Sequence, residues 1–340
     1  MNLGQISALE NHFGKWYECE SNSALANEMF QTSWDSERKE FVMTLTRPPV
    51  KNMINCHNYL IILFILSYLW QLIIFFTGGV DSKFFVLLMF FPAIVAIVFR
   101  IISKEGFQNI GWGLRKWWYV IPAIFIPIVV VFGVAFLLVT LNLATLPDKF
   151  FIFKDGMLEF SFIGLILGNH TQGIPFFILN FVFSHIVFLI IGSIITLGEE
   201  LGWRGYLQEK FLRKFKLNWG LILLGIVWGY WHLPLVLIMG WTFPNHPVLG
   251  AFLLFPISTI FSGIFVGWLY LRSRSIWMPA LAHASLNLFT GFLFLMNMSQ
   301  EDALFAKLIL LVGWGIVAAL CLVSLNRNKP VLWQEKNKTK

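Results

Sequence analysis

Long apolar runs constrain this chain more than any other feature of its sequence. Between Tyr59 and Leu325 eight such runs follow one another, and an α-helix of about 20 apolar residues crosses the roughly 30 Å hydrocarbon core of a bilayer. We place the spans at Tyr59–Phe76, Phe84–Ile102, Trp118–Leu143, Phe176–Leu197, Leu217–Met239, Leu249–Leu271, Trp277–Asn297 and Leu304–Leu325. The sequence therefore predicts an all-α fold, a polytopic membrane helical bundle of about eight transmembrane helices.

The composition agrees with a membrane protein and excludes several other classes. Only 13% of the residues are charged and 57% are hydrophobic, whereas soluble domains carry about 25% charged residues. The net charge of +7 is modest, and no basic patch predicts a nucleic-acid partner. The lipid bilayer is the expected surrounding. Cys19, Cys56 and Cys321 are scattered and form neither a metal-ligand spacing nor a disulfide framework.

Basic residues gather in alternate connections between the spans. They follow spans two, four, six and eight, at Arg100, Lys104, Arg115 and Lys116; at Lys210, Arg213, Lys214 and Lys216; at Arg272 and Arg274; and at Arg327, Lys329, Lys336, Lys338 and Lys340. Lysine and arginine accumulate in the cytoplasmic loops of membrane proteins. We therefore expect a multi-pass protein of the cell membrane with both termini in the cytosol.

Two polar ends flank the expected bundle of residues 56–326. Residues 1–55 show no convincing helical or strand periodicity, and we expect a cytosolic N-terminal arm that is disordered or loosely helical. Met53 lies directly before the first span, so residues 1–52 could instead be an over-long reading frame. The sequence leaves both interpretations open. Residues 327–340 are polar and basic, and we expect a cytosolic tail.

Two adjacent carboxylates and an arginine lie at the end of the fourth span, in the stretch Ile194–Tyr206. A charged residue at the bilayer centre costs roughly 2.5–3.5 kcal/mol on insertion scales, so a pair of them is expected to have a use. Glu200 and Arg204 are four residues apart and can pair on one helix face. Glu199 lies about 100° around the helix and is free to point elsewhere. The alternative is a helix end whose charges simply meet lipid headgroups.

Polar residues of the fifth and seventh spans extend this set. His232 lies deep in span five, four residues after Trp228 and just before Pro234, which breaks or kinks the helix. In span seven His283 and Asn287 are also four residues apart and share a helix face. Each feature has a plainer explanation: a packed histidine in span five, and an interhelical hydrogen-bonding pair without chemistry in span seven.

Residue counting sets a geometric condition on these groups. His232 lies about 15 residues, or some 22 Å, into span five, whereas Glu199 and His283 fall nearer the cytosolic side. They can meet only if span five tilts, starts late or is displaced inward.

The segment Tyr206–Phe215 alternates apolar and basic residues, and we expect an amphipathic helix on the cytosolic membrane surface.

The predicted helices thus carry one main polar cluster at membrane depth, made of Glu199, Glu200, Arg204, His232, His283 and Asn287. A carboxylate, two imidazoles and an amide can activate water, stabilise an oxyanion and protonate a leaving amine. Hydrolysis is the reaction that this set favours. Glu199, His232 and His283 could also bind a divalent metal such as zinc, so metal-free and metal-dependent hydrolysis both stay open.

Three short motifs carry a resemblance to a known family. They are Glu-Glu-x-x-x-Arg at Glu199–Arg204, aromatic-x-x-x-His at Trp228–His232, and His-x-x-x-Asn at His283–Asn287. In order, spacing and membrane context they resemble the motifs of the CPBP intramembrane proteases. That family includes the type II CAAX prenyl endopeptidases and bacterial bacteriocin-processing or self-immunity (Abi) proteins. The resemblance covers residues from about Phe176 to Phe294.

The resemblance implies a multi-helix intramembrane endopeptidase acting on a peptide or protein substrate, including a membrane-anchored one. By that analogy Glu199 and His232 activate the attacking water, while His283 and Asn287 support the oxyanion and the geometry of the site. The family has been described both as metalloproteases and as glutamate-dependent proteases without a metal. No two histidines here are four residues apart on one helix, as compact zinc peptidase sites usually have, which favours the metal-free form.

The resemblance also assigns supporting roles. Glu200 and Arg204 would be a structural pair, as their helical spacing already indicates, and this removes Glu200 as a metal ligand. The second motif of the family usually opens with phenylalanine, whereas here it opens with Trp228. Tryptophan is a conservative replacement for that phenylalanine, because both side chains are aromatic and apolar.

Two other classes of protein remain as alternatives. In a proton-coupled transporter Glu199 or Glu200 would carry the proton, although the sequence shows no inverted repeat with paired broken helices. A non-catalytic membrane scaffold or immunity protein could keep the fold without activity. The intact set of motifs argues against that loss of activity.

Overall fold

The computed structural model describes residues 30–35, 40–45, 50–147, 151–160, 165–168, 171–328 and 330. The chain divides into two compact units, Met1–Ile54 and Asn55–Lys340. In the first unit β1 (Phe30–Asp35) and β2 (Glu40–Leu45) pair as an antiparallel hairpin, which the sequence pattern did not predict. Residues 1–29 of the expected arm and residues 331–340 of the expected tail lie outside the described residues.

The second unit is built from helices. They are α3 (Val50–Phe76), α4 (Phe91–Ile102), α5 (Val120–Thr140), α6 (Ile174–Gly202), α7 (Glu209–Phe215), α8 (Leu217–Trp231), α9 (Leu233–Leu237), α10 (Pro247–Leu249), α11 (Phe255–Ser273), α12 (Trp277–Leu293) and α13 (Gln300–Arg327). A 3-10 helix at Val86–Phe90 leads into α4, and π-helical stretches at Trp203–Gln208 and Gly250–Leu254 precede α7 and α11.

Five helical segments in the described chain are long and apolar enough to cross a membrane, namely Cys56–Phe76, Trp117–Thr140, Ile174–Phe215, Pro247–Ser273 and Gln300–Arg327. Two further apolar helical segments, Val86–Ile102 and Leu217–Trp231, are shorter. The predicted all-α, multi-pass membrane bundle is thereby confirmed. The count of about eight transmembrane helices is not, although each predicted span falls largely on helix.

Apolar side chains cover the outer surface of the bundle. Ile65 and Leu69 on α3 are 55% and 56% exposed, and Val129 and Phe136 on α5 are 68% and 72% exposed. Monomeric soluble proteins rarely expose large contiguous apolar patches. These faces are suited to contact lipid chains, which solvate apolar side chains as well as a protein interior does.

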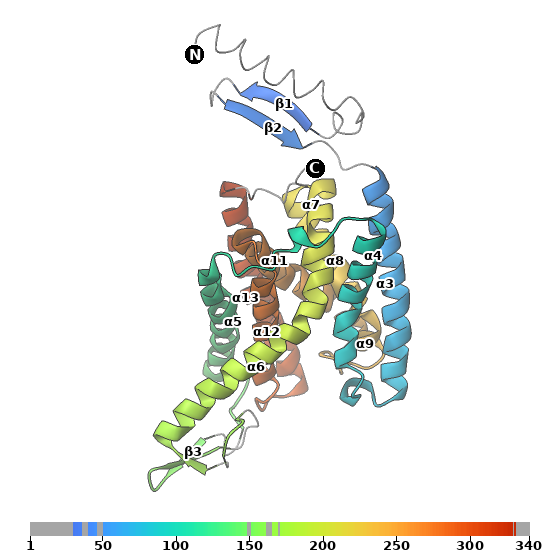
Figure 1. Ribbon diagram of the computed structural model, residues 1–340. Helices are drawn as coiled ribbons and strands as arrows, with labels where there is room; N and C mark the ends of the chain where they lie inside the picture. The colour runs from blue at the N-terminus through green and yellow to red at the C-terminus, as the bar shows by residue number, and fades with distance from the viewer. Residues whose placement is uncertain are drawn as a thin grey trace. The chain divides into compact units, whose positions relative to one another are not determined.

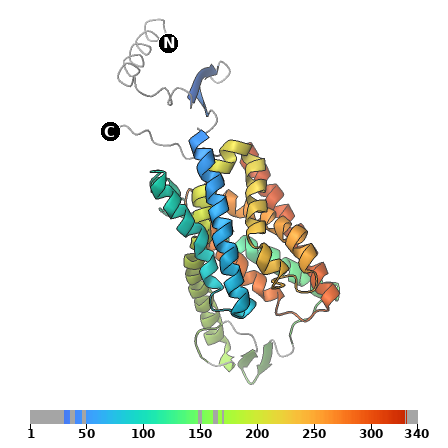
Figure 2. The same cartoon turned by 90° about the vertical axis from the view of Figure 1, so that its right-hand side faces the viewer.

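The long helices run alongside one another (Figures 1 and 2). α6 packs against both α4 and α12, α8 packs against α11, and α11 also contacts α12 and α13. Between α5 and α6 the chain forms a small antiparallel sheet of β3 (Phe151–Lys154), β4 (Met157–Phe160) and β5 (Thr171–Gly173). The apolar pattern of the sequence did not predict this sheet, which lies at the end of the bundle opposite α7 in Figure 1.

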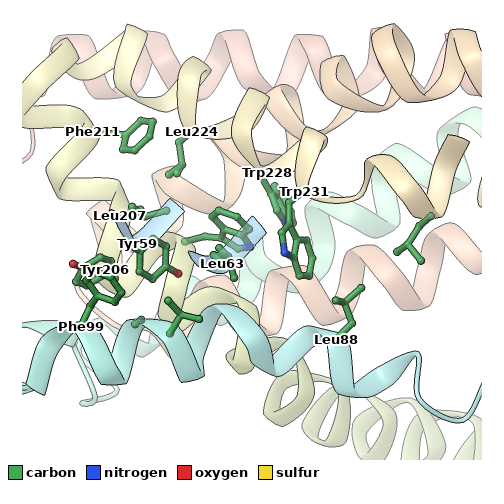
Figure 3. Packing of buried hydrophobic residues seen from close by; sticks show 14 of the residues in the cluster. Tyr59, Leu63, Leu88, Phe99, Tyr206, Leu207, Phe211, Leu224, Trp228 and Trp231 are labelled. Atoms are coloured by element: carbon green, nitrogen blue, oxygen red, sulfur yellow. The ribbon is translucent and has the colours of Figure 1, made fainter. Parts of the chain in front are cut away.

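A cluster of aromatic side chains joins α3, α4 and the α6–α7 segment (Figure 3). The rings of Tyr59 and Tyr206 have centroids 4.6 Å apart, and Phe99 meets Tyr59 edge-on at 5.7 Å. The Tyr59 hydroxyl donates to the carbonyl oxygen of Pro92 at 3.0 Å. A Cβ atom on Gly202 would lie only 2.5 Å from Pro92 Cβ, so glycine lets α6 approach α4 closely.

The helix with the two carboxylates continues well past the predicted end of its span at Leu197. α6 passes into the π-helical stretch, and α7 then ends at Phe215. From Glu199 to Phe215 the helix climbs about 24 Å, and from Leu217 to His232 the chain returns about 22 Å. Because the two paths are nearly equal, His232 returns to the level of Glu199. The two residues therefore lie at the same depth in the bundle, as the sequence analysis required for them to meet.

The expected surface helix at Tyr206–Phe215 is helical, but its apolar face packs inside the protein. Tyr206 and Leu207 are 2% and 0% exposed, and Phe211 is 6% exposed. Their partners are side chains of α3, α4 and α8. Protein rather than lipid therefore covers this apolar face, and the position of the helix at the cytosolic membrane surface stays a prediction.

The predicted break at Pro234 is present, and α3 stabilises it. A proline has no N–H to bond the carbonyl of Tyr230, and the Tyr68 hydroxyl donates to that carbonyl at 2.6 Å. One turn further along α3, the Gln71 side-chain amide donates to the Trp231 carbonyl at 2.9 Å and accepts from the Leu235 N–H at 3.2 Å. A regular helix would join those two backbone groups directly, so Gln71 is inserted into the helical ladder.

We predict that Gln71→Leu lowers the stability of the bundle. The substitution leaves two buried backbone groups without their partner, and each such group costs about 1–3 kcal/mol. The measurement is the midpoint and free energy of unfolding in mixed detergent micelles. Ser67→Ala is the matched control, because Ser67 lies one turn earlier on α3 and its buried hydroxyl has no hydrogen-bond partner in the described chain. Equal stability of the two variants would contradict the role given to Gln71.

Candidate active site

Two glycines on α6 place the carboxylates in the interior of the bundle. A Cβ atom on Gly198 would lie 2.6 Å from the carbonyl oxygen of Met89, and Gly202 meets Pro92 as closely. This face of α6 therefore packs directly against the start of α4. Glu199 and Glu200, between the two glycines, are 3% and 0% exposed. Neither carboxylate reaches a headgroup region, so both must find their partners inside the protein.

Glu199 receives two indole N–H groups on one of its oxygens. Trp228 Nε1 on α8 donates to Glu199 Oε2 at 2.7 Å, and Trp203 Nε1 donates to the same oxygen at 3.2 Å. Hydrogen bonds to a charged acceptor are the stronger ones. They fix the orientation of the carboxylate and leave Oε1 as the oxygen that is available to a ligand.

Glu200 makes a different set of contacts. Its Oε1 accepts from Arg204 Nη1 at 2.9 Å and from His283 Nδ1 at 2.8 Å. The predicted Glu200–Arg204 pair is thus present, and both side chains are almost fully buried. The Arg204 guanidinium also lies over the Trp228 ring, 4.6 Å from its centroid, in a cation–π arrangement. Through Oε1, Glu200 therefore connects α6 with α12.

Both histidines are bound through Nδ1, which decides what the other nitrogen can do. His283 Nδ1 faces a carboxylate, and His232 Nδ1 lies 2.9 Å from the carbonyl oxygen of Trp228. A carboxylate and a carbonyl only accept, so Nδ1 carries the proton in each ring. A ring bonded in this way keeps its orientation and offers Nε2 to a substrate or a water.

His232 lies in a cage of aromatic rings at the break between α8 and α9. Its ring stacks on Trp241 with centroids 5.6 Å apart and meets Trp231 and Phe255 edge-on at 4.6 and 5.0 Å. The Trp228 ring, one helical turn earlier, is tilted at 59° to the imidazole, with centroids 6.2 Å apart, and does not stack on it. Trp228 instead donates to Glu199. The aromatic cage restrains the imidazole without hydrogen-bonding its Nε2.

A cavity of about 580 Å³ brings the predicted site residues together. Glu199, His232, His283 and Asn287 all contribute to its lining, as does Trp228. Asn287 is exposed, and it lies one helical turn from His283. The volume is typical of a pocket for a small ligand or a short stretch of peptide. The cavity therefore combines a fixed carboxylate, two oriented imidazoles and an amide.

The residues of the site do not form a ready metal centre. In the described part of the chain no three His, Cys, Asp or Glu side chains are grouped closely enough to bind a metal ion. Glu200 Oε1 is already shared by Arg204 and His283.

Sequence reasoning missed several residues of the site. Trp203, Trp241 and Phe255 contact Glu199 or His232, but an apolar side chain in a membrane span is expected to pack, and nothing in its spacing shows that it touches a polar group. For Trp203 a signal did exist. It lies four residues after Glu199, on the same helix face.

Comparisons with known proteins agree with the resemblance of the motifs. Residues 178–289 match the family model described as type II CAAX prenyl endopeptidase Rce1-like. CAAX prenyl protease 2 of Methanococcus maripaludis is 28% identical over 167 residues, which cover 47% of this chain and 57% of that protein. The chain thus matches little more than half the length of this curated relative. The family prediction is confirmed for the central region, which contains all three motifs.

We predict that Trp228→Phe lowers kcat/KM for the reaction of this site by about 10- to 100-fold, because it removes one hydrogen bond to a charged acceptor. Trp231→Phe is the control. It removes the same volume from a neighbouring tryptophan whose Nε1 has no partner among the described residues. Steady-state kinetics of both purified variants provide the comparison, and equal losses would show that packing alone, rather than the bond to Glu199, explains the effect.

Proposed function

We propose that this chain, whose central region belongs to the CPBP family, is an intramembrane endopeptidase of the CAAX-protease type. The observation that carries the proposal is the environment of Glu199. Its carboxylate is buried inside a membrane bundle, two indoles bind Oε2, and the side chain lines a cavity shared with two oriented histidines. Burying a carboxylate inside a membrane costs free energy, so a carboxylate at this position is expected to have a function.

In the proposed reaction Glu199 is the general base. Its Oε1 takes a proton from a water as the water oxygen attacks the carbonyl carbon of the scissile peptide bond. His232, with Nδ1 bound to the Trp228 carbonyl, offers Nε2 to the same water. The proton on Glu199 then passes to the leaving nitrogen as the carbon–nitrogen bond breaks. The products are a new carboxylate and a new amine.

Asn287 serves the oxyanion of the tetrahedral intermediate, and His283 supports the geometry of the site beside it. The Asn287 side-chain amide is exposed and lines the cavity, so it can donate a hydrogen bond to the developing negative charge. His283 lies one turn away, and its ring is held by Glu200. A preorganised donor of this kind typically contributes about 2.7–4 kcal/mol to catalysis.

Glu200 and Arg204 support the site without touching the substrate. Neither is among the residues that line the cavity, and their contacts with His283 and Trp228 run through the protein interior. We therefore assign them a structural role.

We predict that Glu199→Gln lowers kcat at least about 100-fold while the protein still folds and inserts, because the amide cannot accept the proton from water. The assay uses purified protein in lipid nanodiscs, a peptide library, and parallel reactions with and without a strong chelator. Glu209→Gln on α7 is the control, since Glu209 pairs with Arg213 outside the cavity and its loss should leave turnover unchanged.

Full activity of the Glu199→Gln variant would overturn the catalytic assignment. Loss of activity on chelation, restored by zinc, would replace the metal-free mechanism by a metal-dependent one. Absence of cleavage by the wild-type protein, together with proton flux that depends on Glu199, would assign the site to a transporter. Absence of both would leave a non-catalytic scaffold.

A further inference from the structure

A buried arginine on α4 takes no part in the proposed reaction. Arg100 lies in the last turn of α4, and its side chain is only 7% exposed. Among the described residues it forms no salt bridge with a carboxylate. A buried charge costs free energy unless hydrogen bonds satisfy it. The contacts of this guanidinium therefore indicate what the arginine does.

The guanidinium of Arg100 joins two backbone segments. Nη2 donates to the carbonyl oxygen of Gly205, inside the π-helical turn Trp203–Gln208, and Nη1 donates to the carbonyl oxygen of Gly106 at 2.7 Å. The guanidinium carbon also lies over the Tyr206 ring, 5.8 Å from its centroid. Hydrogen bonds from a charged donor are among the stronger ones. Arg100 therefore attaches the π-helical turn to the end of α4.

The π-helical turn is a part of the helix that needs support from outside. Its backbone bonds run from residue i to i+5, a geometry that is rare and is found mostly as single turns at functional sites. Gly205 lies inside the turn, and a glycine within a helix destabilises it relative to alanine. Gln208, the last residue of the turn, donates from Nε2 to the carbonyl oxygen of Gly267 on α11 at 3.1 Å. Contacts from α4 and from α11 thus stabilise the turn from two sides.

The same turn holds both carboxylates of the candidate active site. Its first residue, Trp203, donates its indole N–H to Glu199 Oε2, and its backbone N–H donates to the carbonyl oxygens of Glu199 and Glu200. The next residue, Arg204, donates to Glu200 Oε1. Arg100 itself is not among the residues that line the cavity. Its effect on the site therefore runs through the backbone of this one turn.

A salt bridge joins the same two segments a few residues further on. Lys210 Nζ on α7 lies 2.7 and 2.8 Å from the two carboxylate oxygens of Glu105, which directly precedes Gly106. The Lys210 ammonium also lies over the Tyr206 ring, 4.2 Å from its centroid. This salt bridge fixes the start of α7, whereas Arg100 is the side chain from α4 that bonds to the turn itself.

We propose that Arg100 is a positioning residue, which holds the π-helical turn so that Trp203 and Arg204 meet the two carboxylates. This inference rests on the peptidase function proposed above. Without the guanidinium the Gly205 carbonyl loses its donor from α4, and the turn is free to shift. A misplacement of about 1 Å at a catalytic group lowers a rate by about 100-fold. Loss of Arg100 is therefore expected to lower kcat, and to leave KM unchanged because the arginine does not line the cavity.

The first test compares the steady-state kinetics of Arg100→Met and Arg100→Lys with those of wild type. Arg100→Met is expected to lower kcat at least about 10-fold at unchanged KM. Arg100→Lys keeps the charge but lacks the fork that reaches two carbonyls, so an intermediate kcat is expected. Arg272→Met is the matched control, because Arg272 Nη2 also donates to a helix carbonyl, that of Ser324 at 2.5 Å, away from the cavity. Equal losses of kcat in Arg100→Met and Arg272→Met would overturn the proposal.

A double-mutant comparison shows whether the effect of Arg100 runs through the turn. Trp203→Phe removes the indole donor to Glu199. Because both side chains act on the same carboxylate, Arg100→Met should lower kcat by a smaller factor in the Trp203→Phe protein than in wild type. The same factor in both backgrounds would show that Arg100 acts independently of the turn, and would contradict the positioning role.

Hydrogen exchange tests the turn without any turnover, which separates this inference from the peptidase function itself. In lipid nanodiscs the backbone amides of Trp203–Gln208 should exchange at least about 10-fold faster in Arg100→Met than in wild type, because local opening becomes easier. Arg272→Met should leave their exchange unchanged. Unchanged exchange in Arg100→Met overturns the positioning role whatever the activity. Faster exchange in a protein that cleaves no peptide supports the role of Arg100 in holding the turn and contradicts only the peptidase function.

Discussion

The buried carboxylate of Glu200 is the interaction on which the rest of the site depends. One oxygen accepts from Arg204 on its own helical segment and from His283 on α12. The arginine in turn covers the ring of Trp228, whose indole donates to Glu199. Three segments far apart in the sequence are therefore connected by contacts that have no competing water in the membrane interior. Because Glu200 is engaged in this way, Glu199 is the carboxylate that remains for chemistry.

Backbone features of the bundle place these side chains at one level. Gly198 and Gly202 let α6 pack directly against the start of α4, which leaves the carboxylates on faces directed toward other helices. Pro234 ends α8 next to His232, and Gln71 on α3 satisfies the two backbone groups that the break sets free. The geometry of the candidate site thus rests partly on α3, a helix that carries none of the three motifs.

The sequence predicted those parts of the site that follow from local geometry. The Glu200–Arg204 pair and the break at Pro234 needed only helical spacing and the missing N–H of proline. The bond from Trp228 to Glu199 and the role of Gln71 at the break could not be predicted, because each depends on a contact between distant segments. The fourth span was predicted to end at Leu197 because charged residues follow it, and the helical segments expected beyond it prove to be buried against protein.

The measurement that tests the central claim most directly is a double-mutant cycle on Glu200 and Arg204. Unfolding free energies are compared for wild type, Glu200→Gln, Arg204→Met and the double variant in mixed micelles. Arg204→Met alone should cost about 3–5 kcal/mol, since it strands a buried carboxylate. The double variant should regain most of that loss, because the amide carries no charge and still accepts from His283. Additive effects, with no coupling between the two positions, would contradict the claim that this pair organises the site.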